Sequence, residues 1–128
     1  MHEVNILIVD DDDILCEALS DLVELRGGYS ADRAGTAQEA LRKARGKFFN
    51  VALLDLTLPD MEGMDLLRHL KELHGATETI VLTGQRSSEK AEEAVRQGAF
   101  AYLIKPSSLE EIMGAIQRAL AKQQMLEK

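Results

Sequence analysis

Each of four short apolar segments in this chain is followed directly by side chains that could do chemistry. Two segments are followed by carboxylates, one by a hydroxyl and one by an amine. These side chains are Asp10 and Asp11 after residues 6–9, Asp55 after 51–54, Thr83 after 79–82, and Lys105 after 101–104. Carboxylates are the ligands that Mg²⁺ prefers, and a lysine balances the negative charge of phosphate oxygens. The residue types therefore suit a site for a divalent cation and a phosphoryl group.

A parallel β-sheet would bring these distant side chains together. Short apolar runs alternate along the chain with stretches of helical period, which is the pattern of a sheet covered by helices on both faces. The carboxyl ends of parallel strands meet at one edge, where open α/β folds place their chemistry. The second strand is short and half polar, as an edge strand often is. We predict five helices alternating with five strands, at residues 5–10, 29–34, 51–54, 79–82 and 100–104.

The predicted helices begin at capping residues and carry apolar residues at helical spacing. Thr36 and Glu39 have the spacing of a capping box, and glycines at 27 and 28 end the first helix. The third helix is expected from about residue 63 to 74, the fourth after Ser87 or Ser88, and the last from 108 to near 124. Residues expected to face the core include Ile14, Leu15, Val95 and Leu109.

Length, charge and hydropathy exclude several classes of protein. A chain of 128 residues is one domain, and its net charge of −7 argues against direct binding to nucleic acid. No apolar run approaches the roughly 20 residues that span a bilayer, and residues 1–5 lack the features of a signal peptide. The single cysteine, Cys16, excludes an internal disulfide and is expected in the core. We therefore expect a soluble cytoplasmic protein.

The run of four aspartates divides into two pairs with different expected roles. Asp12 or Asp13 is accounted for as the N-cap of the helix that follows. Asp10 and Asp11 end a buried strand, where an unpaired carboxylate is costly and Mg²⁺ is a suitable partner. Asp55 could be a ligand, a cap or a nucleophile that forms an acyl phosphate, and the residues alone leave these roles open.

The other two strand ends add a hydroxyl and a cation. Thr83 could donate a proton to an anion, although threonine in a strand is often only a β-forming residue. Lys105 ends a buried strand and needs a negative partner there. Each signal is weak alone, but a single topology would bring all of them together.

The chain resembles the receiver domain of two-component response regulators over essentially its whole length. The motifs occur in the order and at the spacing of that family. They are residues 6–12 (ILIVDDD), 53–63 (LLDLTLPDMEG), 81–84 (VLTG) and 98–106 (GAFAYLIKP). The resemblance implies a flavodoxin-like, doubly wound sheet of five parallel strands in the order 2-1-3-4-5, with no enzymatic turnover of an external substrate.

The resemblance also assigns a role to each residue at the sheet edge. Asp55 would accept a phosphoryl group from a histidine of a sensor kinase or phosphotransfer protein. Mg²⁺, or Mn²⁺ in its place, would be held by Asp10, Asp11, Asp55 and the backbone carbonyl of Thr57. Lys105 and the Thr83 hydroxyl would contact the phosphoryl oxygens.

Further family features concern the switch and its timing. Tyr102 would follow Thr83 by changing rotamer, and the peptide bond before Pro106 is typically cis in this family. Thr57 and Gln85 lie where the family tunes the lifetime of the phosphoryl group. The chain departs from the common pattern at Gly84, which leaves more room for the loop that carries Thr83. It departs again at Ser107 and Ser108, where the last helix would start differently.

Partners and output follow from the same resemblance. None of the three histidines, His2, His69 and His74, is placed like a phosphodonor, so the donor must come from a partner. The expected output surface combines the helix after Ser87, the strand 100–104 and the last helix, and could support a phosphorylation-dependent homodimer. Residues 1–121 form the predicted receiver domain, and 122–128 a helical extension that could begin a linker to an output domain.

Two alternatives remain at this point. One is a scaffold that resembles a receiver but never accepts phosphate. The other is a Mg²⁺-dependent phosphohydrolase of the haloacid-dehalogenase type, with Asp10 and Asp12 as its Asp-x-Asp pair. That class needs further acids after the lysine, and here nothing acidic follows Lys105 until Glu110 and Glu111, within a predicted helix.

Overall fold

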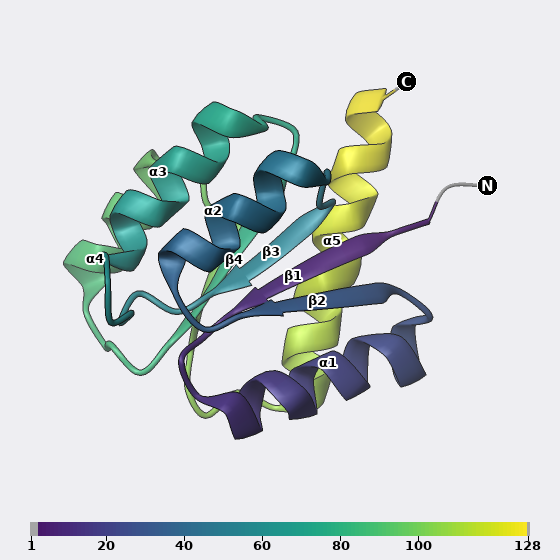
Figure 1. Cartoon of the computed structure of the whole chain (residues 1–128), viewed down its shortest axis with the longest axis horizontal. Coiled ribbons are helices and arrows are strands. Elements are labelled where there is room, and N and C mark those ends of the chain that lie inside the picture. The colour runs from purple at the N-terminus through teal and green to yellow at the C-terminus, as the bar shows by residue number, and fades with distance from the viewer. Residues whose placement is uncertain (1–2, 128) are drawn as a thin grey trace.

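The computed structural model describes residues 3–127 as a five-stranded parallel sheet with helices on both faces (Figure 1). Strands and helices alternate strictly, and the strand order is β2-β1-β3-β4-β5. The elements are β1 (Asn5–Val9), α1 (Asp13–Gly27), β2 (Ser30–Ala34), α2 (Ala37–Gly46), β3 (Val51–Leu54), α3 (Gly63–Leu73), β4 (Glu78–Thr83), α4 (Ser88–Arg96), β5 (Ala101–Ile104) and α5 (Leu109–Glu127). The predicted fold class and strand order are confirmed.

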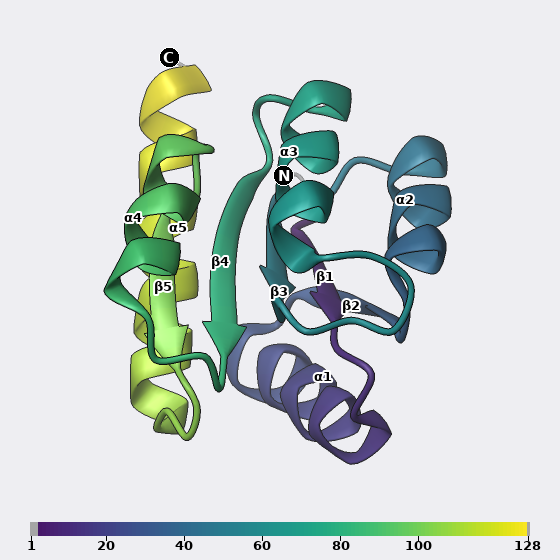
Figure 2. The same cartoon turned by 90° about the vertical axis from the view of Figure 1, so that its left-hand side faces the viewer.

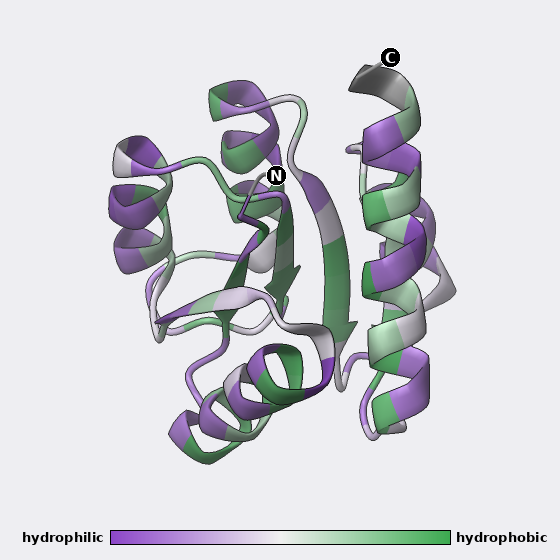
Figure 3. Cartoon of the chain, turned by 90° about the vertical axis from the view of Figure 1, so that its right-hand side faces the viewer, coloured by the Kyte–Doolittle hydropathy of each residue, from purple (hydrophilic) through white to green (hydrophobic). Residues whose placement is uncertain are grey.

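Two apolar cores sandwich the sheet, because side chains of successive strand residues point to opposite faces. Ile6 and Ile8 of β1 join the core that α1 and α5 cover, whereas Leu7 and Val9 join the core under α2, α3 and α4. In Figure 2, α2 and α3 lie to the right of the strands, α5 to the left and α1 below, and α4 overlaps α5 in this view. The central strands are green along most of their length in Figure 3, while the helices carry both colours. Burial on both faces explains why the strands read as continuous apolar runs.

The helix ends follow local chemistry. The Asp12 carboxylate accepts hydrogen bonds from the backbone N–H groups of residues 14 and 15, so this acid is the N-cap of α1. Gly28 closes α1 in the left-handed region, with φ of 70°. Thr36 Oγ1 accepts from the N–H of Glu39, as predicted, but the Glu39 carboxylate bonds to Gly35 rather than to Thr36. The capping box is therefore displaced by one residue.

Ala18 and three larger residues that were expected in the core are exposed. Ile14 is 82% exposed, Val95 62% and Leu109 49%. The buried stripe of α1 contains Cys16, so Ile14 lies about 200° around the helix from it at 100° per residue. Only Ala94 of α4 is buried, and Leu109 stands in the first turn of α5. Helical spacing alone did not reveal which of two adjacent apolar stripes packs on the sheet.

Helix α5 runs on to Glu127 and stays attached to the sheet beyond residue 121. Gln123 is 4% exposed, and its amide exchanges hydrogen bonds of 2.9 Å with the side chain and the carbonyl of Asn50. The ε-amino group of Lys122 lies 3.0 Å from the buried Glu78 carboxylate. The proposed extension of 122–128 thus begins within the packed part of the helix, and residue 128 lies outside the described residues.

Candidate functional site

The carboxyl ends of β1 and β3 place Asp10 and Asp55 side by side. Val9 pairs with Leu54 in the parallel register, and the Asp55 N–H donates to the Val9 carbonyl at 3.0 Å. Asp10 is 3% exposed and Asp55 7%, so both carboxylates are buried at the edge of the core. Buried carboxylates require partners of opposite charge, and the site supplies one from β5.

Lys105 is that partner. Its ε-amino group donates to Asp10 Oδ2 at 2.6 Å and to Asp55 Oδ2 at 3.0 Å. Burial by itself would lower the pKa of Lys105, but the hydrogen bonds and charges of Asp10 and Asp55 outweigh it, and the net pKa is raised. The lysine is therefore a fixed cation between the two carboxylates, as the strand-end pattern required.

A third carboxylate completes an acidic cluster. Oxygen atoms of Asp10, Asp11 and Asp55 lie within 4.8 Å of one another. Asp11 is exposed, so the expectation that both Asp10 and Asp11 are desolvated is correct only for Asp10, and Asp11 extends past the end of β1 into solvent. Three converging carboxylates with one side open to water fit a hard cation such as Mg²⁺, which keeps several of its waters.

The loop between β3 and α3 folds tightly beside Asp55. The Thr57 N–H donates to Asp55 Oδ1 at 3.1 Å, and the Gly63 N–H donates to the Leu56 carbonyl at 2.8 Å. A Cβ atom on Gly63 would lie 2.3 Å from the Leu56 Cα and 2.5 Å from the Asp55 carbonyl oxygen. Glycine is required at position 63 because α3 begins against the backbone of the acidic site.

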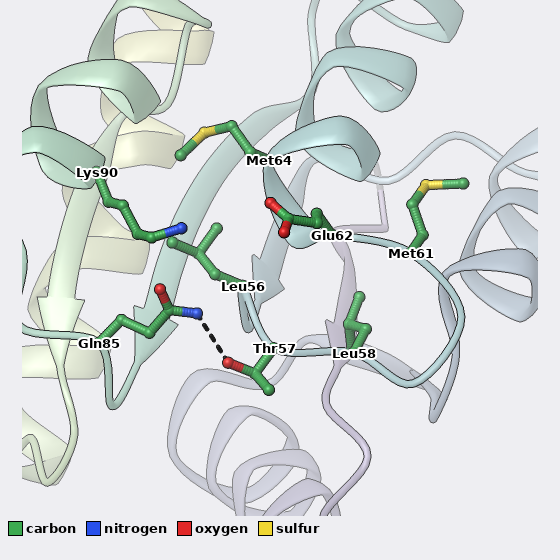
Figure 4. A pocket seen from close by; sticks show the side chains of 8 residues that line it. All are labelled: Leu56, Thr57, Leu58, Met61, Glu62, Met64, Gln85 and Lys90. Carbon is green, nitrogen blue, oxygen red and sulfur yellow. Dashed lines mark hydrogen bonds between the residues drawn. The ribbon is translucent and has the colours of Figure 1, made fainter.

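A series of hydrogen bonds links the loops after β3 and β4 to each other and to strand β5. The Gln85 side-chain amide donates to Thr57 Oγ1 at 2.8 Å, as Figure 4 shows. The Gln85 N–H donates to Thr83 Oγ1 at 3.3 Å, and the Tyr102 hydroxyl donates to the Gln85 carbonyl at 2.7 Å. Burial, followed by the charge of Asp55, raises the pKa of Tyr102. Gln85 thus bonds to Thr83 and Tyr102, the expected switch residues, and to Thr57, the other residue expected to set the lifetime of the phosphoryl group.

A pocket of about 170 Å³ opens beside these hydrogen bonds, between the loop after β3 and the start of α4. Side chains of Thr57, Met64, Gln85 and Lys90 point into it (Figure 4). The pocket adjoins the acidic cluster through Thr57 and gives the Gln85 amide room to move.

The segment after β5 turns sharply at Lys105 and Pro106, whose peptide bond is cis. Ser107 donates its hydroxyl to the Ile104 carbonyl at 2.7 Å. Ser108 Oγ accepts from the Glu111 N–H at 3.1 Å, and the Glu111 carboxylate accepts from the Ser108 N–H at 3.2 Å. Ser108 and Glu111 therefore build a complete capping box at the start of α5, and Ser107 ties the preceding turn to the end of β5.

Sequence reasoning missed two contacts of this region. The bond between Gln85 and Thr57 joins residues 28 positions apart, and the Asp60 carboxylate bonds to the first turn of α2. Neither contact has a signature in residue type or spacing. His74, expected on a solvated face, instead places Nε2 at 3.0 Å from the Ala44 carbonyl oxygen, while His2 lies outside the described residues.

The fold and the site together define a class of protein: an α/β domain of the receiver type, with acids, a threonine and a lysine at the carboxyl edge of its sheet. A family model for the response regulator receiver domain matches residues 6–117. The chain belongs to the response regulator receiver domain family of two-component systems.

Relatives agree with this assignment. Transcriptional regulatory protein ZraR of Escherichia coli O157:H7 is 36% identical over 119 residues, which are 92% of this chain and 26% of ZraR. The chain thus spans about a quarter of the length of that relative. Among residues 3–127, no helix is both long and apolar enough to cross a membrane.

Two solved structures extend the similarity. A CheY-like receiver domain protein from Methanospirillum hungatei JF-1 has a TM-score of 0.93 and 36% identity, with 97% of this chain and 98% of that chain covered. A response regulator from Burkholderia pseudomallei, solved with a phosphorylated aspartic acid, a calcium ion and citrate, has a TM-score of 0.85 and 34% identity. That match covers 98% of this chain and 73% of the other.

Proposed function

We propose that Asp55 accepts a phosphoryl group from a histidine of a partner protein, either a sensor histidine kinase or a phosphotransfer protein. The observation that carries this proposal is the position of Lys105, whose amine bonds to both Asp10 and Asp55 in a buried site. A carboxylate can approach an anionic phosphoryl group only where its charge is balanced, and Lys105 provides a fixed positive charge there.

In the proposed reaction, an Asp55 carboxylate oxygen attacks phosphorus as the phosphorus–nitrogen bond of phosphohistidine breaks. The ring nitrogen of the donor keeps the electron pair of the broken bond. The product is an acyl phosphate on Asp55, and Lys105 stays in contact with the new oxygens. The domain performs no further turnover apart from slow hydrolysis of its own acyl phosphate. A cytoplasmic location would bring the domain together with a partner protein that carries the phosphohistidine.

Asp10, Asp11, Asp55 and the Thr57 carbonyl would hold Mg²⁺, or Mn²⁺ in its place. When bound, the cation neutralises developing charge on the phosphoryl oxygens. The three carboxylates lie close enough to share one ion. The response regulator from Burkholderia pseudomallei was solved with both a phosphorylated aspartic acid and a calcium ion, which supports the proposal that a divalent cation is involved.

The proposed output is a change of packing at the surface formed by α4, β5 and α5. The Thr83 hydroxyl would turn to the phosphoryl group and lose its bond from the Gln85 N–H, and Tyr102 would then leave the Gln85 carbonyl. Helix α4 buries only Ala94, so it can shift at low cost. A homodimer formed through this surface, an output partner or an attached output domain could read the change.

Thr57 and Gln85 would set the lifetime of the acyl phosphate. Their side chains are joined by a hydrogen bond next to Asp55, so a water molecule that approaches from this side must displace the pair. Neither side chain carries a charge that would activate the water. We expect replacement of Gln85 by alanine to shorten the lifetime of the acyl phosphate.

Incubation with acetyl phosphate and Mg²⁺ tests the proposal. We expect the intact mass to rise by one phosphoryl group and this gain to disappear with EDTA or in Asp55→Asn. Asp65→Asn is the matched control, because Asp65 lies in the first turn of α3 and bonds to exposed Arg68. A scaffold that never accepts phosphate would gain no mass, and a phosphohydrolase would show repeated turnover that Asp10→Asn abolishes.

A further inference from the structure

The loop between β3 and α3 is attached at its tip to a helix that takes no part in the proposed chemistry. Asp60 accepts hydrogen bonds from the N–H of Ala37 at 2.9 Å and from the N–H of Gln38 at 3.0 Å, one on each carboxylate oxygen. Ala37 and Gln38 form the start of α2. In Figure 2 the loop after β3 reaches out to this end of α2 before it returns to α3.

The bond pattern at α2 is unusual because two caps share one helix end. The side chain of Thr36, the local N-cap, serves the third free N–H group, that of Glu39, at 3.1 Å. The first two N–H groups are left to Asp60, 23 and 22 positions away in the chain. These bonds lower the pKa of the Asp60 carboxyl, so the acid stays ionised at neutral pH.

The loop that Asp60 attaches is closed and short, so its tip and its base move together. Thr57 and Glu62 form an antiparallel bridge across it, and Gly63 bonds to the Leu56 carbonyl at its base. The space that a Cβ on Gly63 would need is occupied by backbone of residues 55 and 56. A shift of Asp60 therefore has to be taken up near Thr57, whose carbonyl is the proposed fourth ligand.

We propose that Asp60 is a positioning residue for the cation site and couples occupancy of that site to the first turn of α2. The inference rests on the proposed function, because it concerns the same cation. Asp60 touches neither the cation nor the phosphoryl group; it holds the backbone that presents the Thr57 carbonyl. Since coupling between two sites is reciprocal, a bound cation must in turn stabilise the contact of Asp60 with Ala37 and Gln38.

Titration of the full chain with MgCl₂, followed by amide NMR signals, tests this coupling without any phosphoryl donor. We expect Asp60→Ala to raise the Mg²⁺ dissociation constant by about tenfold, the low end for partners that orient a ligand. Thr36→Ala is the matched control: it removes a bond to the same turn of α2 without touching the loop. Its dissociation constant should equal that of the wild type. In the wild type, Mg²⁺ should also slow hydrogen exchange at the Ala37 and Gln38 amides.

Two results overturn the inference while the proposed function survives. One is an unchanged Mg²⁺ dissociation constant in Asp60→Ala, and the other is an equal weakening in Thr36→Ala, which would trace the effect to α2 stability. A wild-type chain that binds no Mg²⁺ overturns both the inference and the cation site on which it rests. If the wild type binds Mg²⁺ and Asp10→Asn does not, the cation site stands, and the Asp60→Ala result then tests the inference alone.

Discussion

Replacement of Lys105 by methionine should destabilise the metal-free domain and should destabilise it less when Mg²⁺ is bound. Methionine keeps most of the length of the side chain but removes its charge and the hydrogen bonds that the amine donates to Asp10 and Asp55. Asp10 and Asp55, whose side chains are 4% and 9% exposed, then lose the cation that bonds to both. They would face each other as two buried carboxylates without a balancing charge.

The size of the effect follows from this burial. Removal of one partner from a buried ion pair costs about 3–5 kcal/mol, because the remaining charge stays desolvated. The Lys105 side chain is 26% exposed, so water can partly replace it. We therefore expect the low end, about 3 kcal/mol, which corresponds to a fall of about 2 M in the urea midpoint for a domain of this size.

Urea unfolding in EDTA and again in excess Mg²⁺ measures both parts of the prediction. Ligand binding to the folded state adds stability by mass action, and Mg²⁺ would supply the charge that methionine lacks. The loss in Lys105→Met should therefore be smaller in Mg²⁺ than in EDTA. Arg68→Met serves as the control, because its bonds to Asp65 and Glu72 join half-exposed side chains and should contribute at most about 1 kcal/mol.

Equal stability of Lys105→Met and the wild type in EDTA would refute this reasoning. It would mean that the two carboxylates are solvated or protonated in the folded domain and need no cation. A loss of the same size in EDTA and in Mg²⁺ would contradict the role of the carboxylates as cation ligands.

Three further outcomes are expected. Burial, followed by the nearby Asp10 carboxylate, raises the pKa of Cys16 to about 11, so it should resist thiol reagents at pH 8 and react once urea unfolds the chain. Gly63→Ala should lower the free energy of unfolding by more than about 2 kcal/mol and Gly46→Ala should not, because a Cβ at Gly63 would overlap backbone atoms whereas a Cβ at Gly46 would meet nothing within 4 Å. Gln123→Leu should lower the free energy of unfolding by about 1–3 kcal/mol, because the Asn50 amide loses its hydrogen-bond partner. Thermal unfolding measures the loss, and Gln123→Asn, which keeps an amide, should lose less.

Much of the fold was predictable because the three central strands, β1, β3 and β4, are buried on both faces. The runs at 6–9 (ILIV) and 51–54 (VALL) contain no polar residue, so the sequence alone predicted them as buried strands. The positions of Asp10, Asp55 and Lys105 then followed from parallel topology alone. Once the strands are parallel, residues at their carboxyl ends must meet.

The remainder depends on contacts between distant residues that carry no local signature. Ile14 and Leu15 are both apolar and adjacent, and only the packing of α1 on the sheet decides that the first faces solvent. The Gln85–Thr57 bond and the attachment of Asp60 to α2 join separate loops, whose relative position is a product of the whole fold. Polar residues in loops are ordinarily solvated, so nothing in the sequence marks these pairs.

The location of the acyl phosphate tests the central claim most directly. After incubation with acetyl phosphate and Mg²⁺, borohydride reduction converts a phosphorylated aspartate to homoserine, and peptide mass spectrometry locates the converted residue. We predict homoserine at position 55 alone, with none in samples that contain EDTA. Conversion of Asp10 or Asp11 instead, or no conversion in a chain that binds Mg²⁺, would contradict the assignment of Asp55 as the phosphoacceptor.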